Sequence, residues 1–163
     1  MKLLYSGMPS ELAAAYRAGA SDANGQMPER HISDGDGVPC RHCLGHVEKG
    51  AAYLILAYRP FPALQPYAEV GPVFVHADPC PAYSPEAGLP PRHRDGRGSP
   101  QILRGYGADH RIVYGTGTVV EPKEIEAKAV ELLEREDVAY LHMRSATNNC
   151  FTLRIDRAAQ SRG

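Results

Sequence analysis

The sequence lacks several of the features from which function is usually inferred. No apolar run approaches the roughly 20 residues that a membrane-spanning helix needs. The opening residues Met1–Gly7 hold too short an apolar stretch for a secretory signal, so we expect a cytoplasmic protein. The 18 Lys and Arg residues nearly balance the 19 Asp and Glu residues. The chain as a whole therefore has no electrostatic attraction to nucleic acid or to an anionic membrane.

Familiar catalytic motifs are missing as well. The chain contains no G-x-S-x-G, no phosphate-binding glycine loop and no H-E-x-x-H, and no internal repeat is evident. The sequence therefore names no enzyme class, and it leaves the ligand and the oligomeric state open. What the chain does have is 163 residues, 43% of them hydrophobic and 23% charged. This composition predicts one globular domain that spans residues 1–163.

The four cysteines are the most informative residues. In a cytoplasmic protein they are expected to be thiols rather than a disulfide framework. Cys40 and Cys43 stand in the segment C-R-H-C, and His76 and Cys80 stand in H-A-D-P-C. Two short turns that each present two donor side chains suit a tetrahedral site with three thiolates and one imidazole. The spacing therefore predicts a structural zinc ion, closed to substrate because all four ligands are protein side chains.

The residues around the two turns favour the same interpretation. Gly45 lies two residues after the first cysteine pair, where backbone N–H groups must approach the thiolates closely. Pro39 and Pro79 restrict the backbone of the two turns.

The sequence also contains residues that suggest other ligand sets. His42 and His46 lie inside the first turn and are alternates for His76. A Rieske iron–sulfur centre is excluded because Tyr83 stands where that motif needs histidine. A Cys2His2 finger is excluded because the segment between the two pairs is far too long and no closing histidine pair follows.

The pattern of apolar residues predicts an α+β fold. We expect a single domain with a mixed or antiparallel sheet, one main amphipathic helix packed on one face, and long loops stapled by the metal site. The expected strands are residues 1–5, 51–58, 70–76, 101–106, 111–120, 138–144 and 151–156. The expected helices are residues 11–18 and 122–135, and the second buries Ile125, Ala129, Leu132 and Leu133. Residues 20–37 and 84–100 are expected to be flexible loops, and residues 158–163 a frayed tail.

A second set of chemically capable residues lies near the carboxyl end. Cys150 is a candidate nucleophile, with His142 as its base and Arg144 as a cation that favours the thiolate. Asn148 and Asn149 are candidates to orient the imidazole or to bind an oxyanion. The more ordinary interpretation is a hydrogen-bonded strand histidine and a structural cysteine.

A basic cluster stands in the most loop-like part of the sequence. Residues 92–97 include Arg92, His93, Arg94 and Arg97, which together could meet a phosphate. In a chain that is close to neutral, a solvated loop is the simpler interpretation.

Several segments together resemble a known family. They are V-P-C-R-H-C-L-G-H-V-E-K-G, Q-P-Y-A-E-V-G-P-V-F-V-H, L-R-G-Y, E-P-K-E-I-E-A-K-A-V-E-L-L and V-A-Y-L-H-M-R-S-A-T-N-N-C-F-T-L-R-I-D-R. In this order they resemble the bacterial family known as domain of unknown function 1203. The resemblance implies a small, soluble, single-domain α+β protein of bacterial type with no established activity.

Three functional hypotheses follow from the sequence. The first is a zinc-stabilised module that binds a small molecule or a protein. The second is a small enzyme that uses Cys150 and His142 in thiol-dependent chemistry. The third and most distant is nucleic-acid binding through the basic residues 92–97. Whether the protein is an enzyme is left open at this point.

Overall fold

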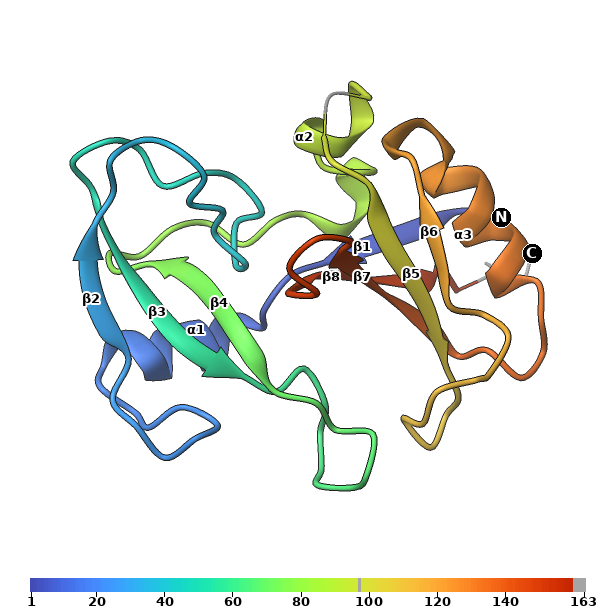
Figure 1. Cartoon of the computed structure of the whole chain (residues 1–163), viewed down its shortest axis with the longest axis horizontal. Helices are drawn as coiled ribbons and strands as arrows, with labels where there is room; N and C mark the ends of the chain where they lie inside the picture. The colour runs from blue at the N-terminus through green and yellow to red at the C-terminus, as the bar shows by residue number, and fades with distance from the viewer. Residues whose placement is uncertain (97, 160–163) are drawn as a thin grey trace. The chain divides into compact units, whose positions relative to one another are not determined.

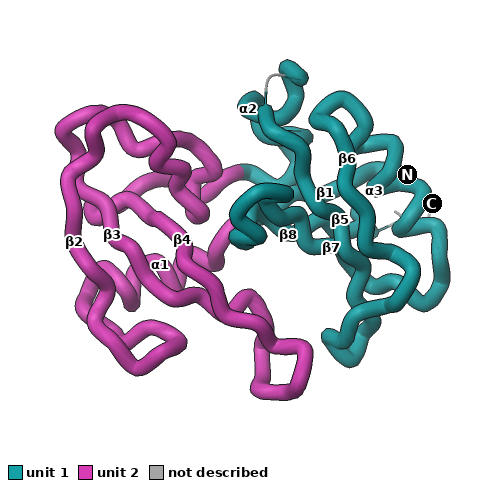
Figure 2. The backbone as a smooth tube through the Cα atoms, viewed as in Figure 1, with its two compact units in different colours: residues 1–6, 84–163 teal, residues 7–83 magenta. Residues whose placement is uncertain are grey.

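The computed structural model describes residues 1–96 and 98–159, and its backbone divides into two compact units. Unit 1 comprises Met1–Ser6 and Ser84–Gly163, and unit 2 comprises Gly7–Tyr83 (Figure 2). Each unit has its own antiparallel sheet (Figure 1). The predicted α+β class is therefore confirmed, but the strands expected in one sheet form two.

Unit 1 is built on a five-stranded sheet with the strand order β1-β8-β7-β5-β6. All neighbouring strands are antiparallel. A register shift interrupts the β7–β8 pairing between Met143 and Arg144. The strands are β1 (Leu3–Ser6), β5 (Gln101–Tyr106), β6 (Thr118–Val120), β7 (Tyr140–Ser145) and β8 (Phe151–Arg157).

The main amphipathic helix belongs to unit 1, as predicted. Its first turn is the 3-10 segment η2 (Pro122–Glu124), and the helix continues as α3 (Ile125–Leu133). The side chains of Glu121 and Glu124 form a capping box, which explains why the helix begins there. The predicted stripe is buried: Ile125, Ala129, Leu132 and Leu133. Unit 1 also contains the short segments η1 (Pro85–Ala87) and α2 (Pro91–Arg94).

The exposed ion pairs near this helix join residues that are closer in sequence than i,i+4 partners. Lys128 lies 2.7 Å from the carboxylate of Glu131, one residue closer in sequence than an i,i+4 partner. Arg135 lies 2.8 Å from Asp137 beyond the helix end. Arg135 pairs with Asp137 because α3 stops at Leu133, so Arg135 is no longer on the helical surface.

Unit 2 contains a three-stranded sheet in the order β2-β3-β4 and one helix. These elements are α1 (Ser10–Arg17), β2 (Glu29–Ile32), β3 (Ala52–Tyr58) and β4 (Gly71–His76). Every second residue of β3 is buried, beginning with Ala52, so one face of this sheet packs on the core. Pro72 lies on β4, at one edge of the sheet, where its missing N–H is tolerated.

Three segments differ from the sequence-based expectations. Of the expected strand 111–120, only β6 is formed, because Val113 bonds to Gly105 in an irregular turn. The expected loop 20–37 contains β2, since pairing with β3 imposes a strand on a polar sequence. The expected loop 84–100 contains η1 and α2. Arg97 and residues 160–163 of the expected tail lie outside the described residues. No helix in the described part of the chain is long and apolar enough to cross a bilayer.

Candidate metal centre

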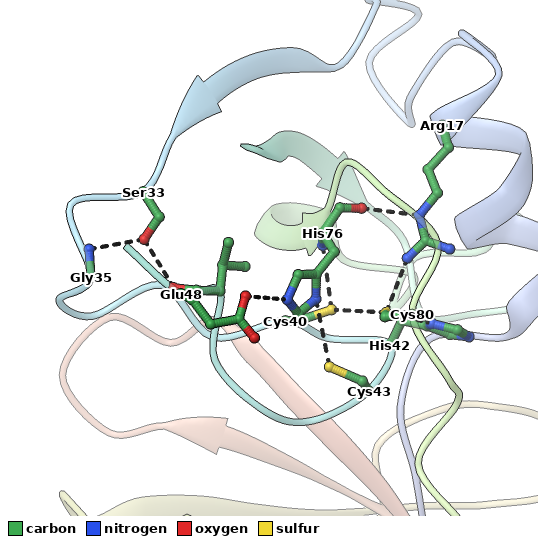
Figure 3. Close-up of polar contacts among 10 residues, drawn as sticks. Arg17, Ser33, Gly35, Cys40, His42, Cys43, Glu48, His76 and Cys80 are labelled. Atoms are coloured by element: carbon green, nitrogen blue, oxygen red, sulfur yellow. Dashed lines mark hydrogen bonds and ion pairs between the residues drawn. The ribbon is translucent and has the colours of Figure 1, made fainter. Parts of the chain in front are cut away.

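The structure brings the two predicted ligand pairs together in unit 2. Cys40 and Cys43 lie in the irregular segment between β2 and β3, His76 is the last residue of β4, and Cys80 follows in the next turn. Their four ligand atoms all lie within 4.8 Å of one another (Figure 3). None of the four cysteines is in a disulfide. The set can therefore hold a metal ion.

The distances within the cluster suit tetrahedral coordination. Bonds of about 2.3 Å to sulfur and about 2.0–2.1 Å to nitrogen give a tetrahedron with edges of about 3.8 Å between two sulfurs and about 3.6 Å between sulfur and nitrogen. The sulfurs of Cys40 and Cys80 are 3.8 Å apart. The sulfur of Cys43 and Nδ1 of His76 are 3.6 Å apart. Both of these separations therefore equal the distances expected between ligands of a tetrahedral metal ion.

The first cysteine turn differs in one respect from the sequence-based expectation. The residue in the left-handed region is Leu44, with a φ of 56°. A β-carbon at Gly45 would meet the sulfur of Cys43 at 3.6 Å, which is ordinary van der Waals contact. The backbone of Gly45 does serve the turn, because its N–H bonds to the thiol of Cys43 and its carbonyl accepts from Cys40 N. The glycine is therefore not required by sterics.

Cys40 is prepared to be the first thiolate of the cluster. A hydrogen bond with the Cys43 thiol, helped by backbone N–H groups of residues 42, 43 and 76, lowers the pKa of Cys40 to about 3, although burial opposes the shift. The same hydrogen bond raises the pKa of Cys43, and burial raises the pKa of Cys80. A metal ion must therefore displace protons from these two thiols, which makes its affinity depend on pH.

Arg17 of α1 supports the cluster from outside. Its Nη2 donates to the sulfur of Cys80 at 3.2 Å, and its Nε donates to the carbonyl of His76 at 3.0 Å (Figure 3). With a divalent cation bound, three thiolates would leave a net charge of −1, which the guanidinium would neutralise. Arg17 thus links α1 to the end of β4 and to the fourth ligand.

His42 lies beside the cluster rather than within it. Its Nδ1 is 3.2 Å from the sulfur of Cys80, and its Nε2 is 2.9 Å from the hydroxyl of Ser10. Burial, followed by the charge of Arg17, lowers the pKa of His42, so the ring is neutral at pH 7. The other alternate ligand, His46, is exposed to solvent. The geometry therefore favours His76 as the nitrogen ligand.

The orientation of His76 is set by its second ring nitrogen. While Nδ1 is directed at Cys43, Nε2 lies 3.6 Å from the carboxylate of Glu48 (Figure 3). Metal-ligating histidines commonly direct their other nitrogen at a carboxylate in this way. The Glu48 side chain is 77% exposed, so the contact orients the ring and adds little stability.

Sequence reasoning missed Arg17 and Ser10. Ser10 is the first residue of α1, the capping position is Pro9, and no side chain caps the helix. Both residues reach the cluster only because α1 packs beside it. No spacing in the sequence signals these contacts, which join residues 32 and 63 positions apart.

The candidate catalytic residues lie in unit 1, on or beside the β7–β8 pair. His142 of β7 is opposite Arg154 of β8. Cys150 precedes β8, its carbonyl accepts from Ser145 N, and its sulfur lies 3.6 Å from the carbonyl of Asn148. Arg144 donates from Nη1 to the carbonyl of Asn149 at 3.1 Å. The residue directly across from His142 is therefore Arg154, and the backbone of Cys150 is hydrogen-bonded to Ser145.

The described residues of the basic cluster form part of α2. Arg94 donates from Nε to the carbonyl of Leu89 and from Nη2 to that of Ala87. His93 is buried, whereas Arg92 is exposed. Arg94 therefore has a local structural role.

Comparison with known proteins identifies the family. The family model described as "Protein of unknown function (DUF1203)" matches residues 37–157, which include all four cluster residues. The chain belongs to this family. No curated protein and no solved structure matches the chain. DUF1203 membership therefore supports the resemblance seen in the sequence without naming an activity.

Proposed function

We propose that this DUF1203 protein is a zinc-stabilised binding module, in which Cys40, Cys43, His76 and Cys80 hold one structural zinc ion. The observation that carries the proposal is the convergence of four donor atoms from two separate segments to within 4.8 Å. Zinc is favoured because it accepts a mixed set of thiolates and imidazole with tetrahedral geometry.

The donor set favours a structural role over a catalytic one. Catalytic zinc sites use three protein ligands and keep the fourth position for water or substrate. Here four protein side chains fill the tetrahedron. The thiolates require reducing conditions, and we therefore place the protein in the cytoplasm.

A thiol-dependent enzyme remains the second candidate from the sequence, but the β7–β8 register offers it less support. Arg154 is opposite His142, and the backbone of Cys150 pairs with Ser145, three residues further along β7. Reaction of the native protein with iodoacetamide tests this alternative. Preferential alkylation of Cys150 that His142→Gln slows would support the enzyme.

Metal analysis tests the zinc site directly. Protein purified without chelator is expected to contain one zinc per chain by mass spectrometry of the metal, and Cys43→Ser is expected to lose most of it. Cys150→Ser is the matched control, because Cys150 lies outside the cluster. Substitution by cobalt should give the visible absorption bands of a tetrahedral thiolate site. Full stability without metal, or equal zinc content in both variants, would refute the proposal.

A further inference from the structure

The sheet of unit 1 carries a polar row on the face opposite α3. The register aligns Arg104 of β5 with His142 of β7, and His142 with Arg154 of β8. Residues directly opposite one another on antiparallel strands point to the same side of the sheet. Their chain neighbours Leu103, Leu141 and Ile155 point to the other side, where they are fully buried and where α3 packs.

Aromatic side chains frame the central histidine. The rings of Tyr106 and Tyr140 are stacked with centroids 5.4 Å apart. The imidazole of His142 lies 4.7 Å from the Tyr106 ring and 5.2 Å from the Tyr140 ring, and it meets Phe151 edge-on at 5.0 Å. His142 is 1% exposed. Its ring is therefore enclosed by these neighbours and supports the side chains around it rather than contacting a ligand itself.

The arginines around this ring are also held in position. The guanidinium carbon of Arg154 lies 3.7 Å above the centroid of Tyr140, and its nitrogens bind Asp156 at 2.7–3.0 Å. Arg104 donates from Nη1 to the hydroxyl of Tyr106 at 3.5 Å. Arg144 lies two residues after His142 on the same strand, with its own contact to the backbone of Asn149. Three guanidiniums thus surround one imidazole.

The charges on this face are strongly unequal. Its described residues on β5, β7 and β8 include the three arginines but one carboxylate, Asp156. Burial lowers the pKa of His142 well below its usual value, and the charges of Arg144, Arg154, Arg104 and His110 add to the effect. The neutral imidazole is therefore a hydrogen-bonding group in a cationic environment. Such an environment favours a negatively charged ligand.

The spacing suits a small ligand group. Arg104 and Arg154 are on strands that flank β7, so their backbones are about 9–10 Å apart. Arginine side chains extend far enough to converge above the middle strand. The guanidinium fork matches a carboxylate or phosphate with two parallel hydrogen bonds.

We propose that Arg104 and Arg154, the partly exposed members of the set Arg104, His142, Arg144 and Arg154, here called the arginine face, bind the oxyanion group of a small-molecule ligand, either a phosphate or a carboxylate. The proposal goes beyond the zinc site, because the cluster lies in unit 2 and the arginine face in unit 1. The zinc proposal and the anion proposal can therefore fail independently of each other. The anion proposal adds the chemical class of the ligand that the binding module would take.

NMR titration of the full-length zinc-loaded protein tests the proposal. Side-chain N–H signals of the arginines and the ring signals of His142 are followed while inorganic phosphate or acetate replaces chloride at constant ionic strength. We expect saturable shifts at Arg104, Arg154 and His142 with a millimolar dissociation constant. Tighter binding of phosphate would identify a phosphate ligand, and tighter binding of acetate a carboxylate ligand. Signals that shift without saturating would overturn the proposal. Shifts of the same size in a control titration with sodium chloride would overturn it as well.

Matched lysine variants assign the site to its residues. Arg104→Lys keeps the charge but loses the fork, and it is expected to weaken binding of the preferred anion about tenfold. Arg135→Lys is the control in the same unit, because Arg135 is exposed and paired with Asp137. If backbone spectra show that Arg104→Lys misfolds, Arg154→Lys is tested in its place. Equal dissociation constants in the variant and the control would contradict the assignment.

Discussion

The two units of the chain differ in the interactions that stabilise them. Among the largest fully buried side chains of the described residues, Val47 is the single one that belongs to unit 2, and the others lie in unit 1. Unit 1 has a five-stranded sheet with α3 packed on one face. Unit 2 has a three-stranded sheet, one helix of 8 residues, and long irregular connections. The candidate metal cluster lies where unit 2 has the least regular structure.

This difference shows how a short chain segment with few large core residues can still be ordered. The cluster joins the segment between β2 and β3 to the end of β4, and Arg17 extends the connection to α1. Small domains that bury little apolar surface commonly depend on a metal or on disulfides. We therefore expect unit 2 to depend on its metal and unit 1 on its apolar core.

Loss of the metal is expected to have the largest effect. Apparent zinc-binding free energies in zinc-finger peptides are about 10–16 kcal/mol, much of which is folding free energy. Cys40→Ser should therefore destabilise unit 2 by several kcal/mol while β5, β7 and β8 stay folded. Hydrogen exchange resolved by peptide measures the two units separately. Cys150→Ser is the control, and equal loss of protection in both units would contradict the comparison.

A cavity in unit 1 should produce the opposite pattern. Leu141 of β7 is fully buried, so Leu141→Ala is expected to cost about 2–5 kcal/mol of unfolding free energy. Protection should fall in unit 1, and the zinc content should stay at that of the unmodified protein. Leu64→Ala is the control, because this leucine is 79% exposed. A fall in zinc content with Leu141→Ala would show that the two units are not independent.

The buried His142 predicts a pH dependence that belongs to unit 1. Its folded-state pKa is lowered, so the unfolded chain takes up the proton first as the pH falls. The neutral ring is tolerated above about pH 6.5, and stability is lost below that value by up to about 1.4 kcal/mol per pH unit until the folded pKa is reached. The charged or titratable groups that face it are Arg104, Tyr106, His110, Tyr140, Arg144 and Arg154.

His142→Phe should remove this component. Exchange rates of β7 and β8 amides, corrected for the intrinsic effect of pH, are compared between pH 7 and pH 5.5. The phenylalanine variant should show a smaller loss of protection than the unmodified protein. His31→Phe is the control, since this histidine is exposed on β2. An unchanged slope in His142→Phe would disprove the assignment.

The sequence predicted the elements, and the candidate ligands that the structure brings together, where their signals are local. Cys40 and Cys43 are two residues of one turn, and α3 buries its stripe because apolar residues recur at helical spacing. The contacts of Arg17 with Cys80 and of His142 with Tyr106 depend instead on tertiary packing. The division of the strands into two sheets also could not be predicted, because the alternation of apolar residues does not indicate which strands pair with each other.

The smallest expected effect concerns a polar clamp in unit 2. Asp22 accepts backbone N–H groups of Asn24 and Gln26 through Oδ1 and that of Ala57 through Oδ2. Burial alone would raise the pKa of this carboxyl, but the three N–H donors outweigh it and lower the pKa. The stabilisation is therefore present above about pH 3.9, the unfolded value, and is lost as the pH falls through the lower folded value.

Asp22→Asn keeps the shape of the side chain, but it removes the charge and replaces one of the two acceptor oxygens with an NH2 group. Because the carboxylate is only partly buried, we expect a loss of no more than about 1 kcal/mol at pH 7, measured by urea unfolding of the zinc-loaded protein. Asp34→Asn is the matched control, since Asp34 accepts the N–H of Asp36 within the same unit. Amides of residues 24–26 and of Ala57 should lose protection, while those around Cys40 should not. Equal losses in the two variants would mean that Asp22 adds nothing beyond an ordinary turn, and that unit 2 is held by its metal and its small core alone.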